Sequence, residues 1–351
     1  MRRGSTCPSR SLHAVRLSDI DYALPDELIA QVPAEPRDSA RLMVDTGGAP
    51  VHKRVSDLVS LVDEGDLLVV NDTRVLQSRL SLRRGSGGAV EVLLLEQSDG
   101  PGCVWEALVR PGRKLRDGEL LEHDGTAVAR VAGRTGSGDT FLVELLGDDP
   151  AGLPSRIGAL PLPPYIRESP VDPERYQTVY SRDAKSAAAP TAGLHFTPEL
   201  LTELESRGVR RAAVELIVGL DTFRPVTDDD PTRHRIHTES YRVPESTMEA
   251  ARAARRVVAV GTTAARALES VAATGRKEGR TSLFITRGHR WEVVDLLMTN
   301  FHMPRTTLLL MIDSFIGPRW RSMYEEAVRE EYRFLSFGDA MLLDRHAKGS
   351  D

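Results

Sequence analysis

Two histidines stand in loops where their side chains could exchange protons with a bound molecule. His195 ends the loop 189–195 (APTAGLH), just before a helix expected to begin at Thr197, and His302 lies in the segment TNFHMP. Histidine is the side chain that titrates nearest neutral pH, so both are candidates for a general acid or base. A lone histidine is also commonly a structural residue, and that alternative stays open for each. His237, two residues before Glu239, is a less favoured third candidate.

Polar residues gather around His302 in a way that is typical of a binding site. Thr299 and Asn300 directly follow an expected strand and precede His302 by three and two residues. Polar side chains at the end of a strand are well placed to contact a ligand, because the loop is fixed by the rigid element before it. These neighbours make His302 more typical of a site than a lone histidine, and the alternative of a hydrogen-bonded structural residue stays open.

A second candidate site follows another expected strand. The run VVAVGTTAARALES from Val257 predicts a buried strand, a tight turn at Gly261, Thr262 and Thr263, and a helix. The first N–H groups of a helix lack partners and attract anions, and ligands of open α/β sheets bind beyond the carboxyl ends of strands. The pattern predicts a carboxylate or phosphate site, and a capped helix without a ligand is the alternative.

Other cofactor patterns are weak or absent in the sequence. The segment GRTGSG at 133–138 joins two expected strands and opens no helix, so it predicts a hairpin turn and not a dinucleotide loop. No carboxylate or cysteine at ligand spacing accompanies the histidines, and we expect no metal. Cys7 and Cys103 are too few for a disulfide framework, which favours a reducing compartment and therefore the cytoplasm.

The elements that must position these residues predict an α/β fold with an all-β insertion. From Asp66 to about Val143 the chain shows short β-rich runs separated by Gly and Asp turns, which is typical of a small antiparallel barrel. Helical and strand patterns alternate after the proline-rich segment LPLPPY. We expect an N-terminal extension at 1–16, an α/β catalytic domain made of 17–65 and 155–345, and an inserted barrel domain at 66–154.

Size and charge limit the partners. The chain has 351 residues and a formal net charge of −5, so a nucleic acid would need a local basic face. The stretch 241–290 holds ten basic and four acidic residues and is a candidate for that face, although arginines on a solvated helix are an equal alternative. The longest apolar run, around 308–312, is far too short for a membrane helix, and the N-terminal segment lacks the apolar core of a signal peptide.

The motifs together resemble the S-adenosylmethionine:tRNA ribosyltransferase-isomerase family of queuosine biosynthesis. The likeness runs from about Leu17 to Leu343. Its landmarks, in chain order, are DYALPDELIAQVPAEPRDSARL, GDLLVVNDTRV, LPLPPYI, YQTVY, APTAGLHF, VGTTAARALES, TNFHMP and YRFLSFGDAM. The resemblance also implies a β-barrel domain beside an α/β domain.

The resemblance implies a reaction in which S-adenosylmethionine is consumed as a ribosyl donor. The ribosyl group is transferred and isomerised onto 7-aminomethyl-7-deazaguanine in tRNA, giving epoxyqueuosine, adenine and methionine. His195 and His302 are then expected to transfer protons, and Asn300 and Thr299 are expected to orient the substrate in the catalytic site. The expected binding residues for S-adenosylmethionine are Gly261, Thr262, Thr263, Arg266, Pro190, Thr191, Gly193 and Thr299, and Asp72, Arg74 and Arg79 are expected to line the cleft between domains.

The sequence departs from the family pattern near the expected site. Ile217 stands where the family commonly has a histidine, and Glu215 and Asp221 add carboxylates. Lys185 and Arg287 replace a usual glycine and proline. These changes leave two alternatives open. One is a paralogue that uses S-adenosylmethionine on a small molecule or as a lyase, and the other is a catalytically silent protein that binds tRNA or a nucleotide. We favour a monomer.

Overall fold

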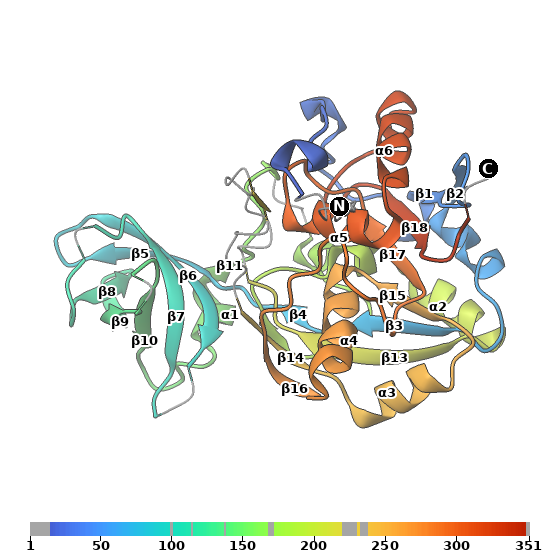
Figure 1. Cartoon of the computed structure of the whole chain (residues 1–351). Helices are drawn as coiled ribbons and strands as arrows, with labels where there is room; N and C mark the ends of the chain where they lie inside the picture. The colour runs from blue at the N-terminus through green and yellow to red at the C-terminus, as the bar shows by residue number, and fades with distance from the viewer. Residues whose placement is uncertain are drawn as a thin grey trace, which may run out of the picture.

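The structure is a mixed α/β fold in two lobes of unequal size, which confirms the predicted fold class. The computed structural model describes residues 15–98, 101–113, 115–136, 138–167, 172–219, 230–231 and 238–348. The larger lobe is built on a nine-stranded sheet and the smaller on a seven-stranded antiparallel sheet (Figure 1). His237, Asp221 and residues 1–14 of the expected extension lie outside the described residues.

The nine-stranded sheet carries its most buried strands at its centre. Its order is β16 (Glu278–Thr281), β14 (Glu239–Arg242), β13 (Arg210–Leu216), β3 (Leu67–Asn71), β15 (Val257–Val260), β17 (Leu296–Asn300), β18 (Ala340–Asp344), β1 (Arg41–Val44) and β2 (Val51–Arg54). Strands β13, β3, β15 and β17 are parallel, and every residue of β3, β15 and β17 is buried. Continuous apolar runs of this kind suit strands that are covered on both faces.

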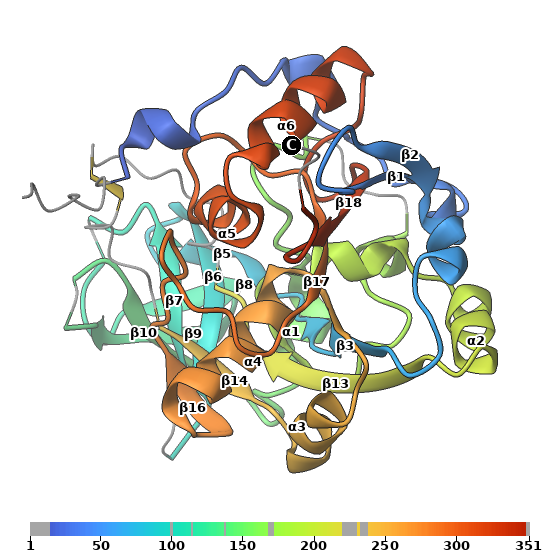
Figure 2. The same ribbon diagram turned by 45° about the vertical axis from the view of Figure 1, so that its right-hand side comes forward.

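Helices cover the two faces of this sheet (Figure 2). On one face, alternate residues of β3 and β15 pack against α4 (Thr262–Thr274), α5 (Thr307–Ile316) and α6 (Arg319–Arg329). On the other face, the intervening residues pack against α2 (Pro198–Ser206) and the 3-10 helix η4 (Val55–Ser60). The remaining described helices are α1 (Leu153–Ile157), α3 (Glu245–Arg252), η1 (Leu17–Ile20), η2 (Asp26–Leu28), η3 (Arg37–Ser39), η5 (Pro173–Tyr176) and η6 (Thr191–His195). In the described part of the chain, no helix is long and apolar enough to cross a membrane.

The smaller lobe is a closed antiparallel barrel. Its strand order is β11 (Gly158–Ala159), β5 (Arg79–Arg84), β6 (Ala89–Gln97), β7 (Val104–Arg110), β10 (Phe141–Leu145), β9 (Thr126–Arg134) and β8 (Leu120–His123), and pairing of β5 with β8 closes it. Burial alternates along β7, as expected for a strand with one face toward a core. A separate pair, β4 (Arg74–Val75) with β12 (Ala184–Ser186), lies outside both sheets.

One strand lies in a different sheet from the one that the sequence predicted. We expected residues 67–71 to open the barrel insertion, but β3 pairs with β13 and β15 at the centre of the larger sheet. The five residues of β3 are all buried, and such a run lacks the alternation of a barrel strand. The barrel strands run from Arg79 to Ala159, and the division of the chain into domains remains a prediction.

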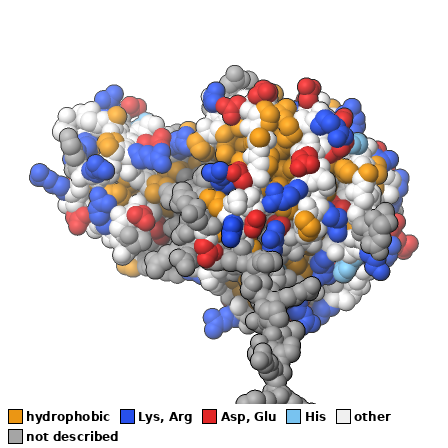
Figure 3. All heavy atoms as spheres, turned by 45° about the horizontal axis from the view of Figure 1, so that its top comes forward, with side chains coloured by type: hydrophobic (Ala, Val, Ile, Leu, Met, Phe, Trp, Pro, Cys, Tyr) orange, Lys and Arg blue, Asp and Glu red, His pale blue; other side chains and the backbone are white. Residues whose placement is uncertain are grey.

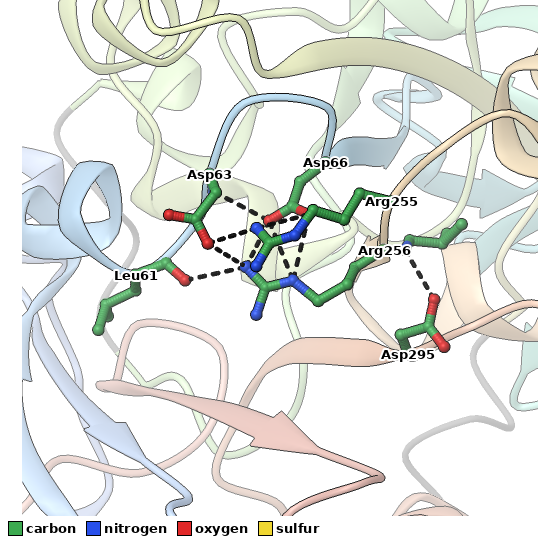
Figure 4. A network of polar contacts seen from close by, with 7 residues as sticks. Leu61, Asp63, Asp66, Arg255, Arg256 and Asp295 are labelled. Carbon is green, nitrogen blue, oxygen red and sulfur yellow. Dashed lines mark hydrogen bonds and ion pairs between the residues drawn. The ribbon is translucent and has the colours of Figure 1, made fainter.

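A network of ion pairs holds the amino ends of β3 and β15 together (Figure 4). Asp66, whose side chain is fully buried, accepts hydrogen bonds at 3.1 Å from Nε of Arg256 to both carboxylate oxygens. Asp63 pairs with Arg255 and, at 3.2 Å, with Arg256. Because β3 and β15 are parallel, this network lies at the end of the sheet opposite to their carboxyl ends.

Candidate active site

A pocket opens beyond the carboxyl ends of β15 and β17, where the sequence places both polar turns. It contains about 630 Å³ of space free of protein atoms, a figure that includes the solvent at its open mouth. Of the predicted site residues, eight line it: Pro190, Thr191, Gly261, Thr262, Thr263, Thr299, Asn300 and His302. The structure therefore brings together three segments that are far apart in the sequence.

The amino end of α4 forms one wall of the pocket and is suited to an anion. Gly261 precedes the helix with φ of 88°, a conformation that favours glycine, and its N–H donates to the carbonyl of Met298 at 2.7 Å. The first turn of the helix contains no acidic residue, and Oγ1 of Thr263 is buried without a hydrogen-bond partner in the described residues. Unpaired N–H groups beside an unpaired hydroxyl are the features expected of a carboxylate or phosphate site.

His302 lines the same pocket as a neutral imidazole. Its Nε2 lies 3.1 Å from Oγ1 of Thr299, and its backbone N–H donates to the hydroxyl of Tyr324 at 3.0 Å. Tyr22 donates a short hydrogen bond to the carbonyl of His302. Burial lowers the pKa of His302 to about 3. An imidazole that is neutral at physiological pH can accept a proton from a ligand. It lacks the additional proton that an imidazolium cation could donate.

Asn300 ties the walls of the pocket together. Its Oδ1 accepts a hydrogen bond at 3.0 Å from the hydroxyl of Thr191, and its Nδ2 donates at 3.0 Å to the carbonyl of Leu335. All three residues line the pocket. Asn300 is thus fixed by two neighbouring segments, and its side chain holds η6 and the loop before β18 against the end of β17.

His195 is near the pocket but not in its wall. Its Nδ1 lies 3.0 Å from the carbonyl of Ala192 and its Nε2 lies 2.9 Å from the carbonyl of Gly338, so backbone carbonyls meet both ring nitrogens. Burial lowers the pKa of His195. His195 is not among the residues that line the pocket, and its expected role in proton transfer stays a prediction.

Two predicted binding residues also lie away from the pocket. Gly193 is enclosed behind it, and a Cβ there would meet the hydroxyl of Tyr180 at 2.0 Å, so the close approach explains the glycine. Arg266 forms a buried ion pair with Glu239 and donates at 3.0 Å to the carbonyl of Leu283. It lies one turn beyond the amino end of α4 and faces β14 and β16, so it fastens the sheet edge and does not reach the pocket.

Three of the altered charges near the expected site have partners within the protein. Lys185 lies 3.1 Å from the carboxylate of Glu215, so two of the departures from the family pattern form one ion pair. Arg287 makes two hydrogen bonds, at 2.5 and 3.0 Å, to the buried carboxylate of Asp313. The backbone N–H of Ile217 donates at 2.9 Å to Ser240. The charges of Lys185, Glu215 and Arg287 are thus paired within the protein, and nothing in the structure explains the isoleucine at position 217.

The residues expected to line a cleft between domains also have protein partners. Asp72 lies 3.4 Å from Arg182, and Arg74 pairs with Glu174. Arg79 donates at 3.3 Å to the carbonyl of Leu162. None of the three lines the pocket at the carboxyl ends of β15 and β17.

The basic stretch 241–290 does not form an unpaired basic face. Acidic partners lie within ion-pair distance of eight basic residues: Arg252, Arg255, Arg256, Arg266, Lys277, Arg280, Arg287 and Arg290. Figure 3 shows basic and acidic side chains interspersed over the face that it presents. Local excess charge in the sequence is thus largely neutralised by acids from elsewhere in the chain.

Sequence reasoning missed the pocket residues Tyr165 and Ser336. The hydroxyl of Tyr165 lies 2.7 Å from Oγ of Ser336, and both side chains line the pocket. They belong to LPLPPY and YRFLSFGDAM, motifs already noted in the sequence. No group of three His, Cys, Asp or Glu side chains in the described ranges could hold a metal ion.

Comparison with known proteins assigns the chain to a family. Residues 17–343 match the family model described as queuosine biosynthesis protein. A protein of Rubrobacter xylanophilus named S-adenosylmethionine:tRNA ribosyltransferase-isomerase is 50% identical over 332 residues, covering 94% of this chain and 98% of that protein. A protein of the same name from Symbiobacterium thermophilum is 49% identical over 342 residues, covering 94% of this chain and 100% of the relative.

A solved structure is similar over nearly the same length. The crystal structure of an S-adenosylmethionine tRNA ribosyltransferase from Thermotoga maritima shares 36% sequence identity and a TM-score of 0.53 with this chain. It covers 92% of this chain, and 99% of its own length is matched. The fold, the collinear motifs and these likenesses agree, and the chain belongs to the queuosine biosynthesis protein family.

Proposed function

We propose that this chain is an S-adenosylmethionine:tRNA ribosyltransferase-isomerase. It transfers and isomerises the ribosyl group of S-adenosylmethionine onto 7-aminomethyl-7-deazaguanine in tRNA, giving epoxyqueuosine with release of adenine and methionine. The relatives that share half of its residues carry this name. The observation that carries the proposal is that the amino end of α4 and the buried histidine His302 line one pocket. The cytoplasm, where tRNA is modified, is the compartment that this proposal implies.

The amino end of α4 would hold the methionine carboxylate. The unpartnered Oγ1 of Thr263 and the free N–H groups of the first turn supply donors, and the helix dipole favours a negative charge there. Pro190 and Thr191 form the facing wall. The fit rests on a buried hydroxyl without a hydrogen-bond partner in the described residues, at a residue that lines the pocket.

His302 would act as the base. A sulfonium makes the protons on the adjacent ribose C5′ more acidic, and a neutral imidazole in a dry pocket can accept one of them. Thr299 orients the ring through its contact with Nε2, and among the described residues no hydrogen bond reaches Nδ1 of His302. Asn300 fixes the wall beside it.

The paired charges leave tRNA as the favoured acceptor. The alternative of a changed acceptor rested on Lys185, Glu215, Ile217, Asp221 and Arg287. Lys185 is paired with Glu215 and Arg287 with Asp313, so neither ion pair leaves a charge for a different ligand. No contact in the described residues favours the small-molecule, lyase or binding-protein alternatives.

Adenine and methionine release tests the proposal. The protein is incubated with S-adenosylmethionine and tRNA that carries 7-aminomethyl-7-deazaguanine, and both products are quantified. Release that depends on this tRNA supports the proposal, and tRNA carrying guanine at the same position is the control. Release without RNA would favour the lyase or small-molecule alternative, and no release with any acceptor would favour a binding protein.

A further inference from the structure

The proposed reaction needs a proton donor, and the pocket offers few titratable groups. Of the described residues that line it, the titratable side chains are His302 and Tyr165. Burial keeps His302 neutral, which suits a base but leaves no proton to supply at the start of a turnover. His195 is enclosed by carbonyls behind the wall. The departing purine must gain a proton, so the second titratable group in the wall becomes the candidate.

Tyr165 is held in place through its backbone and its hydroxyl. Nε2 of Gln31 donates at 3.0 Å to the carbonyl of Tyr165, and Oε1 of Gln31 accepts from the N–H of Arg167 at 2.9 Å. The phenol oxygen lies 2.7 Å from Oγ of Ser336. A donor fixed at both ends loses little freedom when a substrate binds, which is a requirement for efficient proton transfer.

The backbone that carries Ser336 adopts a conformation that costs free energy. Leu335 has φ of 70°, in the left-handed region that leucine rarely adopts. Its N–H donates at 3.1 Å to the carbonyl of Phe301, and its carbonyl accepts from Nδ2 of Asn300. Strain of this kind is retained where the surroundings enforce it, commonly at functional sites. The end of β17 thus positions Ser336 opposite Tyr165.

We propose that Tyr165 is the general acid that protonates adenine as it leaves, with Ser336 as its positioning partner. The inference rests on the proposed function. The C1′–N bond breaks with its electron pair going to adenine, and a lone pair of the ribose ring oxygen forms the replacement bond to C1′. The phenol gives adenine a proton and becomes a phenolate. His302 takes one proton from C5′, and the electron pair of that C–H bond stays on C5′ beside the sulfonium. In one turnover the protein therefore loses one proton from Tyr165 and gains one at His302. Proton exchange with the solvent then returns both side chains to their starting states.

The protonation state of Tyr165 agrees with this role. Burial raises the pKa of Tyr165 to about 12, so the phenol keeps its proton throughout the physiological range. Burial favours the uncharged form of both side chains. At the start of a turnover, His302 therefore has a nitrogen that can accept a proton, and Tyr165 holds a proton that it can donate.

The test first removes the hydroxyl of Tyr165 and then changes the purine that leaves from S-adenosylmethionine. Tyr165→Phe keeps the ring, and we expect kcat for adenine release to fall about 100-fold, the lower end of the range for general acid catalysis. The dissociation constant for S-adenosylmethionine, measured by calorimetry, should stay close to the wild-type value. An analogue with an electron-poor purine, which leaves without protonation, should recover most of the lost rate. Ser336→Ala should show a smaller loss with the same dependence on the purine.

Tyr332→Phe is the matched control. Its hydroxyl bonds His52 at 2.7 Å, it does not line the pocket, and it lies four residues before Ser336. The inference is overturned if Tyr165→Phe keeps wild-type kcat, or if its loss is the same for the natural and the electron-poor purine. Failure of the proposed function would look different, because the wild-type protein itself would then release no adenine with the modified tRNA.

Discussion

Oγ1 of Thr299 lies 3.1 Å from Nε2 of His302, and the two side chains share a wall of the pocket. The contact spans three residues at the end of β17, where the chain leaves the sheet. It fixes the plane of the imidazole and engages one of its two nitrogens, which leaves Nδ1 as the atom that faces a substrate in our proposal.

Replacement of His302 by glutamine should abolish most of the proton abstraction. Glutamine fills a similar volume and can still contact Thr299, but it cannot accept a proton. We expect kcat for adenine release to fall about 100-fold or more, a typical loss for a general base. His52→Gln, at the partly exposed contact with Tyr332, is the control and should keep full activity. Wild-type turnover in His302→Gln would remove the base assignment.

Stability should decrease as the pH falls below neutrality, in part because of His302. Its pKa is about 3 in the folded protein and about 6.5 in an unfolded chain, so the unfolded state takes up a proton first. The stabilisation is complete above about pH 6.5 and is lost progressively as the pH falls toward 3. Burial also lowers the pKa of His195, which acts in the same direction. Melting temperatures from pH 8 to pH 4 should therefore fall less steeply in His302→Gln than in the wild type.

Replacement of Thr263 by valine should weaken binding of S-adenosylmethionine without changing the chemistry. The change removes a buried hydroxyl that has no partner in the described residues, and it keeps the shape of the side chain. One hydrogen bond to a charged group contributes about 1.5–3 kcal/mol, which corresponds to a loss of affinity of about 10-fold or more. Calorimetry measures the affinity, and kcat at saturation should stay near its wild-type value.

Thr202→Val is the control for this substitution. Thr202 is an exposed residue of α2 whose hydroxyl bonds its own helix at 2.9 Å. Equal affinities for all three proteins would show that Thr263 does not contact the ligand.

Replacement of Arg287 by alanine should destabilise the protein and leave the choice of acceptor unchanged. The carboxylate of Asp313 is fully buried and also accepts from Nε1 of Trp320 at 2.9 Å, so loss of Arg287 leaves a buried charge without its ion partner. Breaking a buried pair typically costs about 3–5 kcal/mol; because Arg287 is partly exposed, we expect about 2 kcal/mol. Urea unfolding measures the loss, and Asp313→Asn in the same chain should recover part of it. A changed preference between modified and unmodified tRNA would contradict this prediction.

The sequence predicted the fold class and the polar turns of the pocket because both depend on local patterns. Gly261, Thr263 and His302 follow buried strands, and strand ends of a parallel sheet meet at one edge. The sheet membership of β3 was predicted wrongly because residues 67–71 stand next to the barrel strands in the sequence, although their continuous apolar run is typical of a strand covered on both faces. The direction of a side chain also could not be predicted from the sequence. His195 and Arg266 lie close in the sequence to residues that line the pocket. In the structure, however, the imidazole of His195 contacts backbone carbonyls and the guanidinium group of Arg266 pairs with Glu239.

Ion pairs between distant segments were equally hidden in the sequence. Lys185 and Glu215 looked like two separate departures from the family pattern, and their contact became visible only when β12 and β13 were placed. The same holds for the basic stretch 241–290, whose partners include Asp63, Asp66, Glu96 and Asp313. The net charge of a sequence segment does not reveal the charge of the surface that the segment forms when the acidic residues that neutralise the segment come from other elements.

The network of Asp63, Asp66, Arg255 and Arg256 occupies one end of strands whose other end forms the pocket. Sequence changes at the two ends are therefore separated by the full length of a strand. A lineage that adapts to a different growth temperature can strengthen or relax the network while the catalytic edge stays as it is. Variation among relatives at positions 63, 66, 255 and 256 would then follow habitat, whereas variation at the pocket would follow substrate.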